Sequence, residues 1–372
     1  MSTRWQSLHV YYYDEDKTGL LLDAIRPLLE QISGQVTASY FVRHWRQGPH
    51  VRVPVLASED VFDAVVRPAA TDIVGGYLTS HPSITTIDEP ALLAAHRELA
   101  SLEDETGPLT PFIPDNTLLV AGHDRRLDVV GSDAAATLFE GFHAAATPLA
   151  FSMLAAMRSG RSRLAVGLEV LVGVVAAFCP PVTRGAVSLR SHADSFIAQS
   201  GDPNGLRTRF DDLYSAHRVA LMAAVRDAVA ALDTGADTAP FARECNALLV
   251  RVRDQAAALL ESGLMSLDGP AGDARPATPW SGDWGDWVGD SPLHGAMTDD
   301  NGFAAALGGA AWFREYRLVL NLLYLHLYRV GVTGAERYLL CHLAANAIED
   351  VYGVSALDEV RAFAKLTAVF EP

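Results

Sequence analysis

The sequence predicts an α+β fold, with an N-terminal ferredoxin-like βαββαβ unit over residues 1–105 and a mostly α-helical region over residues 106–372. Strand and helix signals alternate along the first ninety residues in the order that defines the ferredoxin-like pattern. Beyond them, apolar residues recur with the helical period. Of the 372 residues, 49% are hydrophobic and 20% charged, so a large core can form, and we expect one compact unit.

The elements of the N-terminal region follow from residue type and spacing. Short β-branched and aromatic runs predict strands at 7–13, 39–45, 50–56 and 83–87. Apolar spacing predicts a helix over 18–32, and Ser58 followed by two acids is typical of the start of a second helix that runs to about Tyr77. Gln47-Gly48-Pro49 predicts the turn between the second and third strands.

The rest of the chain is predicted to be helical. Apolar periodicity marks helices at 90–102, 133–158, 163–178, 205–233, 239–262 and 302–330. Two capping-box patterns, which begin at Thr333 and Ser355, predict two final helices. The connection over 269–302 is rich in Gly, Pro, Asp and Ser and contains Trp280, Trp284 and Trp287. Three tryptophans argue against free disorder, so this segment is either an ordered flap or a loop that packs on its own domain.

Charge and cysteine content exclude several classes of function. The chain carries 45 acids against 29 Lys and Arg, a net charge of −16, which disfavours nucleic-acid binding. The three cysteines lie far apart without a CxxC pair, which excludes a disulfide scaffold and is typical of the reducing cytoplasm. The N-terminus has no signal-peptide pattern. The most apolar stretch, 164–179, contains Glu169 and predicts a buried helix, so we expect no membrane span.

Standard cofactor and metal motifs are missing from the sequence. It contains no GxGxxG after a strand, no GxxxxGK(S/T), no HExxH and no GxSxG. A calcium-loop-like run from Asp14 places Ile25 where a bidentate carboxylate is required. The twelve histidines form no pair with acids at clear metal-ligand spacing. We therefore expect neither a metal ion nor a redox cofactor.

The first candidate site is a basic cluster in the second and third predicted strands. It contains Arg43, His44, Arg46, His50 and Arg52. Because side chains alternate along a strand, a hairpin would gather His44, His50 and Arg52 on one surface. Such a surface suits an anion, a carboxylate or a polarised carbonyl. The alternative is a solvated hairpin edge whose arginines pair weakly with local acids.

The second candidate site lies on the late helix. Arg317, Asn321, Tyr324 and Tyr328 share one helix face at i, i+4, i+7 and i+11, and leucines cover the rest. His326 lies in the same run, and His342 and Asn346 share a face four residues apart on the next helix. Buried polar groups must be hydrogen-bonded, either internally or to a ligand, and phenols with an imidazole can transfer protons. A satisfied polar network in a helical core remains the alternative.

Three short motifs together resemble a known family. They are the opening Trp5-Gln-Ser-Leu-His-Val-Tyr-Tyr-Tyr, the element Gly48-Pro-His-Val-Arg52-Val and the late His342-Leu-Ala-Ala-Asn346. In this order they resemble the C-terminal elimination domain of lantibiotic dehydratases, which also occurs as the thiopeptide-type bacteriocin biosynthesis protein. The resemblance covers the whole chain, and only the combination of motifs is specific.

The departures from that family indicate a branch within it. Members that eliminate glutamate carry a second hairpin arginine, where this chain has Pro54, and a further arginine, where it has Leu118. Asn346 is followed by alanine in place of the family arginine. The cations that hold the glutamate carboxylates are thus largely lost, while His342 and Arg52 remain. In these departures, in length and in the Tyr-rich late helix, the chain is similar to the thiopeptide pyridine synthases.

That resemblance implies the substrate and the reaction. The substrate would be a leader-bearing precursor peptide with azoles and dehydroalanines, and other modification enzymes of the pathway are further possible partners. Two dehydroalanines would undergo a formal aza-[4+2] cycloaddition that closes a macrocycle, with loss of water and of the leader as an amide. One amide must first become an imidic acid, and holding both peptide ends together lowers an entropic barrier.

The resemblance and the residue patterns lead to specific roles. We expect proton transfer by Tyr324, Tyr328, His326 and His342. Peptide carbonyls would be held by Arg317 and Asn321, with His50 and Arg52 also binding substrate. The three tryptophans Trp280, Trp284 and Trp287 would form a wall for azole rings, and Arg43 and Arg46 would contact the leader.

Two other functions stay open from the sequence. One is a stand-alone eliminase that acts after a separate glutamylating partner, and the lost arginines count against it. The other is a non-catalytic subunit that binds the leader without changing the mass of the substrate.

Overall fold

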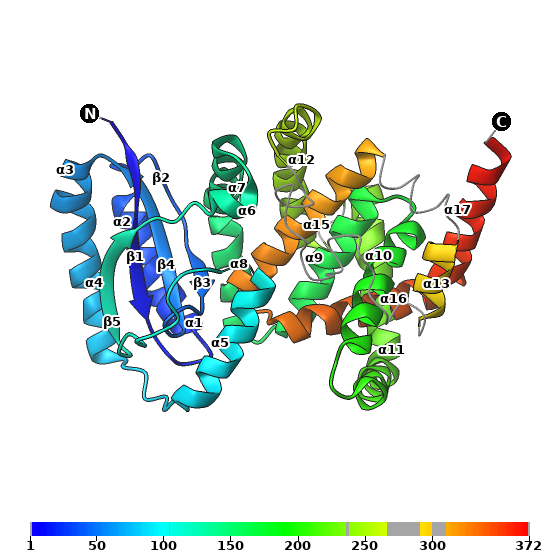
Figure 1. Cartoon of the computed structure of the whole chain (residues 1–372), viewed down its shortest axis with the longest axis horizontal. Helices are drawn as coiled ribbons and strands as arrows, with labels where there is room; N and C mark the ends of the chain where they lie inside the picture. The colour runs from blue at the N-terminus through cyan, green and yellow to red at the C-terminus, as the bar shows by residue number, and fades with distance from the viewer. Residues whose placement is uncertain (1, 104, 236–237, 266–290, 300–309, 371–372) are drawn as a thin grey trace. The chain divides into compact units, whose positions relative to one another are not determined.

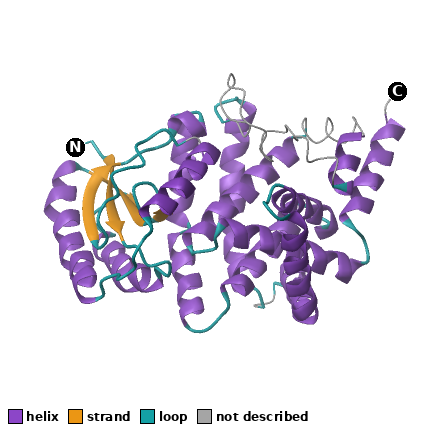
Figure 2. Ribbon diagram, turned by 60° about the horizontal axis from the view of Figure 1, so that its bottom comes forward, coloured by secondary structure: helices purple, strands orange, loops and turns teal. Residues whose placement is uncertain are grey.

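The computed structural model describes residues 2–103, 105–235, 238–265, 291–299 and 310–370. The chain divides into two compact units, coloured along the chain in Figure 1. Unit 1 comprises residues 1–129, 139–160 and 328–331, and unit 2 comprises residues 130–138, 161–327 and 332–372. The described strands all belong to unit 1, and Figure 2 shows them gathered in one sheet.

The sheet of unit 1 is antiparallel. Its strands are β1 (Arg4–Tyr11), β2 (Ala38–Ser39), β3 (Val42–His44), β4 (His50–Ala57) and β5 (Thr117–Gly122). Their order is β2-β4-β1-β5, with β3 also paired to β4. The strands expected from the first three runs are therefore present, and the second of them is divided into β2 and β3.

Pro54 gives a physical reason for that division. The peptide N–H of Tyr40 donates to the carbonyl of Pro54 over 3.1 Å, but Pro54 has no N–H to return. The ladder is therefore incomplete at Tyr40 and Phe41, between the end of β2 and the start of β3.

The strand expected at 83–87 was wrong. These residues are irregular, and the last strand of the sheet is instead β5, which follows helix α5 (Glu89–Glu103). The side chain of Asn116 explains the difference, because its Oδ1 accepts from the peptide N–H of Ser83 (2.7 Å) and its Nδ2 donates to the carbonyl of Ser83 (2.9 Å). A side-chain amide thus takes the place of a strand partner.

Two helical segments cover the apolar face of the sheet. The first consists of α1 (Thr18–Leu20), a π-helical turn (Leu21–Ile25) and α2 (Arg26–Ile32). The second consists of α3 (Glu59–Val61), a π-helical turn (Phe62–Val66) and α4 (Arg67–Ser80). In both, the π turn ends at an Arg-Pro pair, where proline cannot donate an α-helical hydrogen bond.

The apolar core of the sheet follows from strand alternation. Leu8 and Val10 of β1 face Val53 and Val51 of β4, and all four are at most 1% exposed. Their neighbours in sequence point to the opposite face, which carries the polar side chains.

Helices make up the remaining described structure. Those between β5 and α9 are α6 (Leu127–Val130), α7 (Asp133–Ala145) and α8 (Thr147–Arg158). Unit 2 contains α9 (Arg163–Phe178), α10 (Val182–Ala198), α11 (Pro203–Thr234), α12 (Pro240–Glu261), α13 (Pro292–Asp299), α16 (Gly334–Tyr352), α17 (Ala356–Phe370) and most of α15 (Ala311–Arg329). The single helix expected at 133–158 is interrupted at Ala146, because a new helix begins at Thr147 with Pro148 in its first turn. The capping box at Thr333 is confirmed.

Candidate functional site

The polar face of the unit 1 sheet carries a cluster of aromatic and basic side chains. The register sets Tyr11 opposite His50, His9 opposite Arg52 and His44 opposite His50, so all five share one face. The ring centroid of His50 lies 4.4 Å from that of Tyr11, 5.1 Å from that of His9 and 5.3 Å from that of His44. We call these five residues the hairpin cluster. The structure thus brings together the three hairpin residues that strand alternation grouped.

His50 is held in one protonation state by its two hydrogen bonds. Its Nδ1 lies 2.8 Å from the carbonyl oxygen of Gly48, and Arg52 Nε donates to its Nε2 over 3.1 Å. Because a carbonyl accepts only and this guanidinium N–H donates only, the proton of His50 lies on Nδ1. Burial is the main reason that the pKa of His50 falls to about 2, and the nearby Arg52 lowers it further.

Gly48 makes this arrangement possible. Its φ is +117°, and a Cβ placed there would lie 2.6 Å from Oη of Tyr13. Glycine therefore allows the turn that aims its carbonyl at His50.

The two hairpin arginines that share this surface have different partners. Arg46 Nη1 donates to Oε1 of Glu105 over 2.7 Å, and the Glu105 side chain is only 4% exposed. Arg52 forms no ion pair with a carboxylate of the described residues, and its one hydrogen bond there is to His50. Burial, followed by the charge of Arg46, lowers the pKa of Arg52 to about 10. Arg52 remains cationic at neutral pH and is suited to a carbonyl or carboxylate of a ligand.

Arg43 has a different environment from the rest of the basic run. Its Nε donates to the carbonyl of Arg329 over 3.1 Å, and its Nη1 to the carbonyl of Glu15 over 3.4 Å. These contacts hold residues of unit 1 together.

In unit 2, Tyr324 belongs to a buried polar network. A hydrogen bond of 2.8 Å joins its Oη to Nδ1 of His192, and a contact of 3.3 Å joins it to Sγ of Cys341. The guanidinium of Arg337 lies 4.8 Å from the ring centroid. Burial raises the pKa of Tyr324 well above its ordinary value, while burial and then Arg337 lower the pKa of His192 to about 3. At neutral pH both groups are therefore uncharged.

His342 lies close to charged side chains in unit 2, although neither of its ring nitrogens forms a hydrogen bond of good geometry among the described residues. Its ring is fully buried, and its Nε2 lies 3.0 Å from Oδ1 of Asp211. Burial, then the charge of Arg190, lower its pKa to about 4, although Asp211 acts in the opposite direction. Arg190 also donates to Asn346 over 3.0 Å, so the late His-Asn pair is placed next to a guanidinium.

The continuous helix α15 keeps Arg317, Asn321, Tyr324 and Tyr328 on one face, as their spacing predicts, with His326 on the opposite face; these residues differ in burial. Arg317 and Asn321 are half-buried, His326 is fully buried, and Tyr328 is 39% exposed. Tyr328 belongs to unit 1, whereas the other three belong to unit 2. The tryptophans Trp280, Trp284 and Trp287 lie outside the described residues.

Helix α10 carries site residues that sequence analysis missed. His192 contacts Tyr324, Ser191 Oγ lies 2.9 Å from Nε2 of His294, and Arg207 donates to Asp194 over 2.9 Å. The helix was missed because it follows two prolines and contains many poor helix formers. Its buried residues Val182, Ala186, Leu189, Ala193 and Ile197 nevertheless have helical spacing, which was the available signal.

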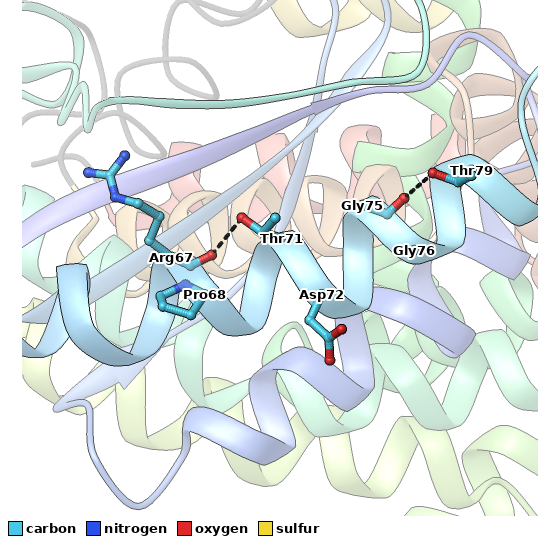
Figure 3. Close-up of a pocket in the computed structure, with 7 residues that line it drawn as sticks. All are labelled: Arg67, Pro68, Thr71, Asp72, Gly75, Gly76 and Thr79. Carbon is cyan, nitrogen blue, oxygen red and sulfur yellow. Dashed lines mark hydrogen bonds between the residues drawn. The ribbon is translucent and has the colours of Figure 1, made fainter.

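No group of three His, Cys, Asp or Glu side chains placed to hold a metal ion occurs among the described residues. None of the helices there combines the length and the apolar character that a bilayer span requires. The hollow drawn in Figure 3 is lined by residues of α4 alone, from Arg67 to Thr79, and does not involve the clusters above.

Comparison with known proteins then places the chain. Residues 5–348 match the family described as lantibiotic biosynthesis dehydratase C-term. The chain belongs to this family. The resemblance read from the sequence is thereby confirmed. A search of curated proteins gave no match.

Two solved structures align with nearly the whole of this chain. One, described as a pyridine synthase, TbtD, from thiomuracin biosynthesis, is 33% identical, has a TM-score of 0.76 and aligns over 95% of this chain and 100% of its own. The other, TsrL, is 24% identical, has a TM-score of 0.69 and aligns over 97% of this chain and 99% of its own. The second likeness concerns the fold alone.

Proposed function

We propose that this family member is a thiopeptide pyridine synthase. The observation that carries the proposal is the 33% identity to a pyridine synthase over 95% of this chain and the full length of that protein. The substrate is a precursor peptide that bears a leader, azoles and two dehydroalanines. The lost arginines at Pro54, Leu118 and Ala347 argue against glutamate elimination.

The proposed reaction is a cycloaddition followed by two eliminations. An amide next to one dehydroalanine shifts its proton to oxygen, which produces a 2-azadiene. Two carbon–carbon bonds form, from the methylene carbon and the imidic acid carbon of the azadiene to the two alkene carbons of the second dehydroalanine, and close the macrocycle. Water and then the leader, as a peptide amide, leave and produce the aromatic pyridine. Each step after ring closure moves protons but requires no oxidant.

The chain offers neutral groups for these proton movements. We propose Tyr324 as the principal one, because its hydroxyl is uncharged at neutral pH and directly bonded to a neutral imidazole, that of His192. We propose His342 as a second proton-transfer group, because its lowered pKa leaves the imidazole neutral, and thus without the proton it would accept, at neutral pH. Tyr328 and His326 retain the same proposed role, from their position on α15.

Substrate binding is proposed for cationic and amide side chains. Arg52 would hold a peptide carbonyl on the polar face of the sheet through its remaining N–H donors. His50 would take part by orienting Arg52, because its single N–H already donates to the carbonyl of Gly48 and its Nε2 accepts from Arg52. Arg317 and Asn321 would hold carbonyls in unit 2. Arg43 and Arg46, proposed from sequence to contact the leader, already bond to protein groups, so any role in leader binding would use their remaining N–H donors.

We also propose that the sheet of unit 1 is a ferredoxin-like unit. In chain order, counting β2 and β3 together, its strands lie in the spatial order 2-3-1-4 and are all antiparallel. This supports two interleaved βαβ units, with α5 in the second connection.

Mass spectrometry tests the function. The purified chain alone is incubated with a dehydrated, azole-containing precursor. A pyridine synthase releases the leader as an amide and gives a macrocycle lighter by that amide and one water. An eliminase acts instead on a glutamylated peptide and forms dehydroalanine, and a binding subunit leaves the mass unchanged. Either of these outcomes would refute the proposal.

Variants test the role of Tyr324. We expect Tyr324→Phe to lower kcat at least about 100-fold, the lower end of the range typical of lost acid–base groups. Tyr338→Phe is the matched control, because Tyr338 also belongs to unit 2 but packs its ring on Phe196 at 4.3 Å. Equal rates for wild type and Tyr324→Phe would remove Tyr324 from the mechanism.

A further inference from the structure

The two edges of the unit 1 sheet are unequal. One edge is divided into the short strands β2 and β3. The other edge is β5, a continuous strand that pairs with β1 alone. Edge strands expose a row of backbone N–H and C=O groups that another chain can pair with.

The register shows which groups of β5 are unused. The N–H of Tyr12 donates to the carbonyl of Pro49, so even-numbered residues of β1 direct their backbone groups toward β4. Odd-numbered residues therefore face β5, where His9 is opposite Leu119. Leu118, Val120 and Gly122 consequently point their N–H and C=O away from β1. Across the described ranges, no other backbone group is bonded to them.

The side chains of β5 do not protect this edge. Leu119 is 38% and Val120 40% exposed, although both are apolar. The strand sequence from Thr117 to Gly122 contains no charged residue and no proline. Charges, prolines and bulges are the usual devices that keep an edge strand from pairing. An uncovered apolar edge of this kind is suited to an added strand.

We propose that the β5 edge binds an extended segment of the leader peptide as an additional strand. This inference rests on the proposed function, which supplies a leader-bearing peptide as substrate. Azole formation removes an amide N–H and the preceding carbonyl oxygen from the backbone. An azole-rich core therefore lacks the regular donors and acceptors that strand pairing needs, whereas an unmodified leader keeps them.

The position of β5 links this edge to the hairpin cluster. Leu119, His9 and Arg52 form one row across the sheet and share its polar face. A leader strand would lie about 4.8 Å beyond β5 in the plane of the sheet. Its side chains on that face would continue the surface on which Arg52 lies.

Hydrogen exchange measured by NMR on the full chain provides the direct test. The probe is a synthetic peptide with the unmodified leader sequence of the precursor. We expect the amides of Leu118 and Val120 to exchange rapidly in the free protein and at least about tenfold more slowly with the peptide. Those of Thr117 and Leu119 already bond to β1 and should change little. The proposal would be overturned if exchange slowed equally at all four amides, or if it did not slow at any of them.

A pair of variants gives an independent measurement. Val120→Pro removes an outward N–H without removing a bond to β1, and Val120→Ala keeps that N–H while shortening the side chain. We expect Kd for the labelled leader to rise about tenfold, equivalent to 1.4 kcal/mol, in Val120→Pro but by less than about threefold in Val120→Ala. Equal effects would show that the side chain alone is responsible and would overturn strand pairing.

The outcomes also separate this inference from the proposed function. Alternating protection without any pyridine product supports leader pairing and refutes the synthase. Pyridine formation with unchanged leader affinity in Val120→Pro supports the synthase and refutes leader pairing. If β5 instead pairs with a second copy of the chain, sedimentation will show a dimer that Val120→Pro dissociates. The Kd for the leader will then be the same in both proteins, and this result refutes the proposal.

Discussion

Replacing Arg329 by methionine should strongly destabilise unit 1. The guanidinium is 1% exposed and has no carboxylate among its described partners. It donates to the carbonyl of Phe41 (2.8 Å), the carbonyl of His143 (3.1 Å) and Oγ1 of Thr147 (2.7 Å). It also lies 4.7 Å from the ring centroid of Phe41. One side chain thus joins the end of α15 to three other segments of unit 1.

The magnitude follows from what the substitution leaves behind. Methionine keeps most of the apolar volume, so the cavity contribution is small. The carbonyl of Phe41 loses a charged donor, while that of His143 retains a bond from Thr147. An unsatisfied buried group costs about 1–3 kcal/mol, and a hydrogen bond to a charged group contributes about 1.5–3 kcal/mol. We expect a loss of about 3–4 kcal/mol in the free energy of unfolding of unit 1.

Native-state hydrogen exchange measures this loss in the correct unit. Amides of β1 and β4 should exchange about 100- to 1,000-fold faster in Arg329→Met. The control is Arg158→Met, which breaks the ion pair to Asp23 whose side chains are 45% and 49% exposed, and which should cost less than about 1 kcal/mol. If the two variants differ by less than about 1 kcal/mol, the reasoning about the buried guanidinium is wrong.

Three further changes should have measurable effects. Glu169→Gln should lower the free energy of unfolding by about 1–2 kcal/mol, because the carboxylate accepts N–H groups in the first turn of α12 and pairs with Arg161. Thermal or denaturant unfolding measures this loss, and an unchanged midpoint would contradict it. Gly48→Ala should cost about 1–3 kcal/mol, since its φ is +117° and the new Cβ would meet Tyr13, whereas Gly34→Ala, in open space, should change stability little. The pKa of His50 is about 2 in the folded chain and 6.5 in the unfolded chain. Between these values only the unfolded chain binds a proton at His50, so the stability of the fold falls as the pH drops below 6.5. In His50→Gln the slope of unfolding free energy between pH 6 and 3 should be shallower by about 1.4 kcal/mol per pH unit, and an identical slope would show that His50 protonates in the fold.

The fold was predictable where local pattern and tertiary context agree. Alternation in 50–56 and helical spacing in 163–178 gave elements that the structure contains. The strand expected at 83–87 failed because the side chain of Asn116, distant in sequence, takes the place of its pairing partner. No local pattern reports such a contact. The same limitation applies to the break between β2 and β3, which depends on Pro54 in a neighbouring strand.

The candidate site shows a similar division. Strand alternation placed His44, His50 and Arg52 together, because register carries that information. The partner of Tyr324 was not predictable, since His192 lies 132 residues away on a helix of poor helix formers. Likewise, sequence showed Arg43 and Arg46 as one basic run, but it could not show that one bonds to carbonyls and the other to Glu105.

The bond between Arg329 and Phe41 has a consequence for assembly. Phe41 lies at the gap between β2 and β3, and the side chain of Arg329 occupies the carbonyl that an incoming chain would need at that edge. An added strand at that edge would meet this contact at Phe41, so the β5 edge is the better placed of the two to accept a strand. We expect a complex of one leader per protein chain, because a sheet that accepts a single extra strand cannot propagate into a fibre or recruit a second peptide.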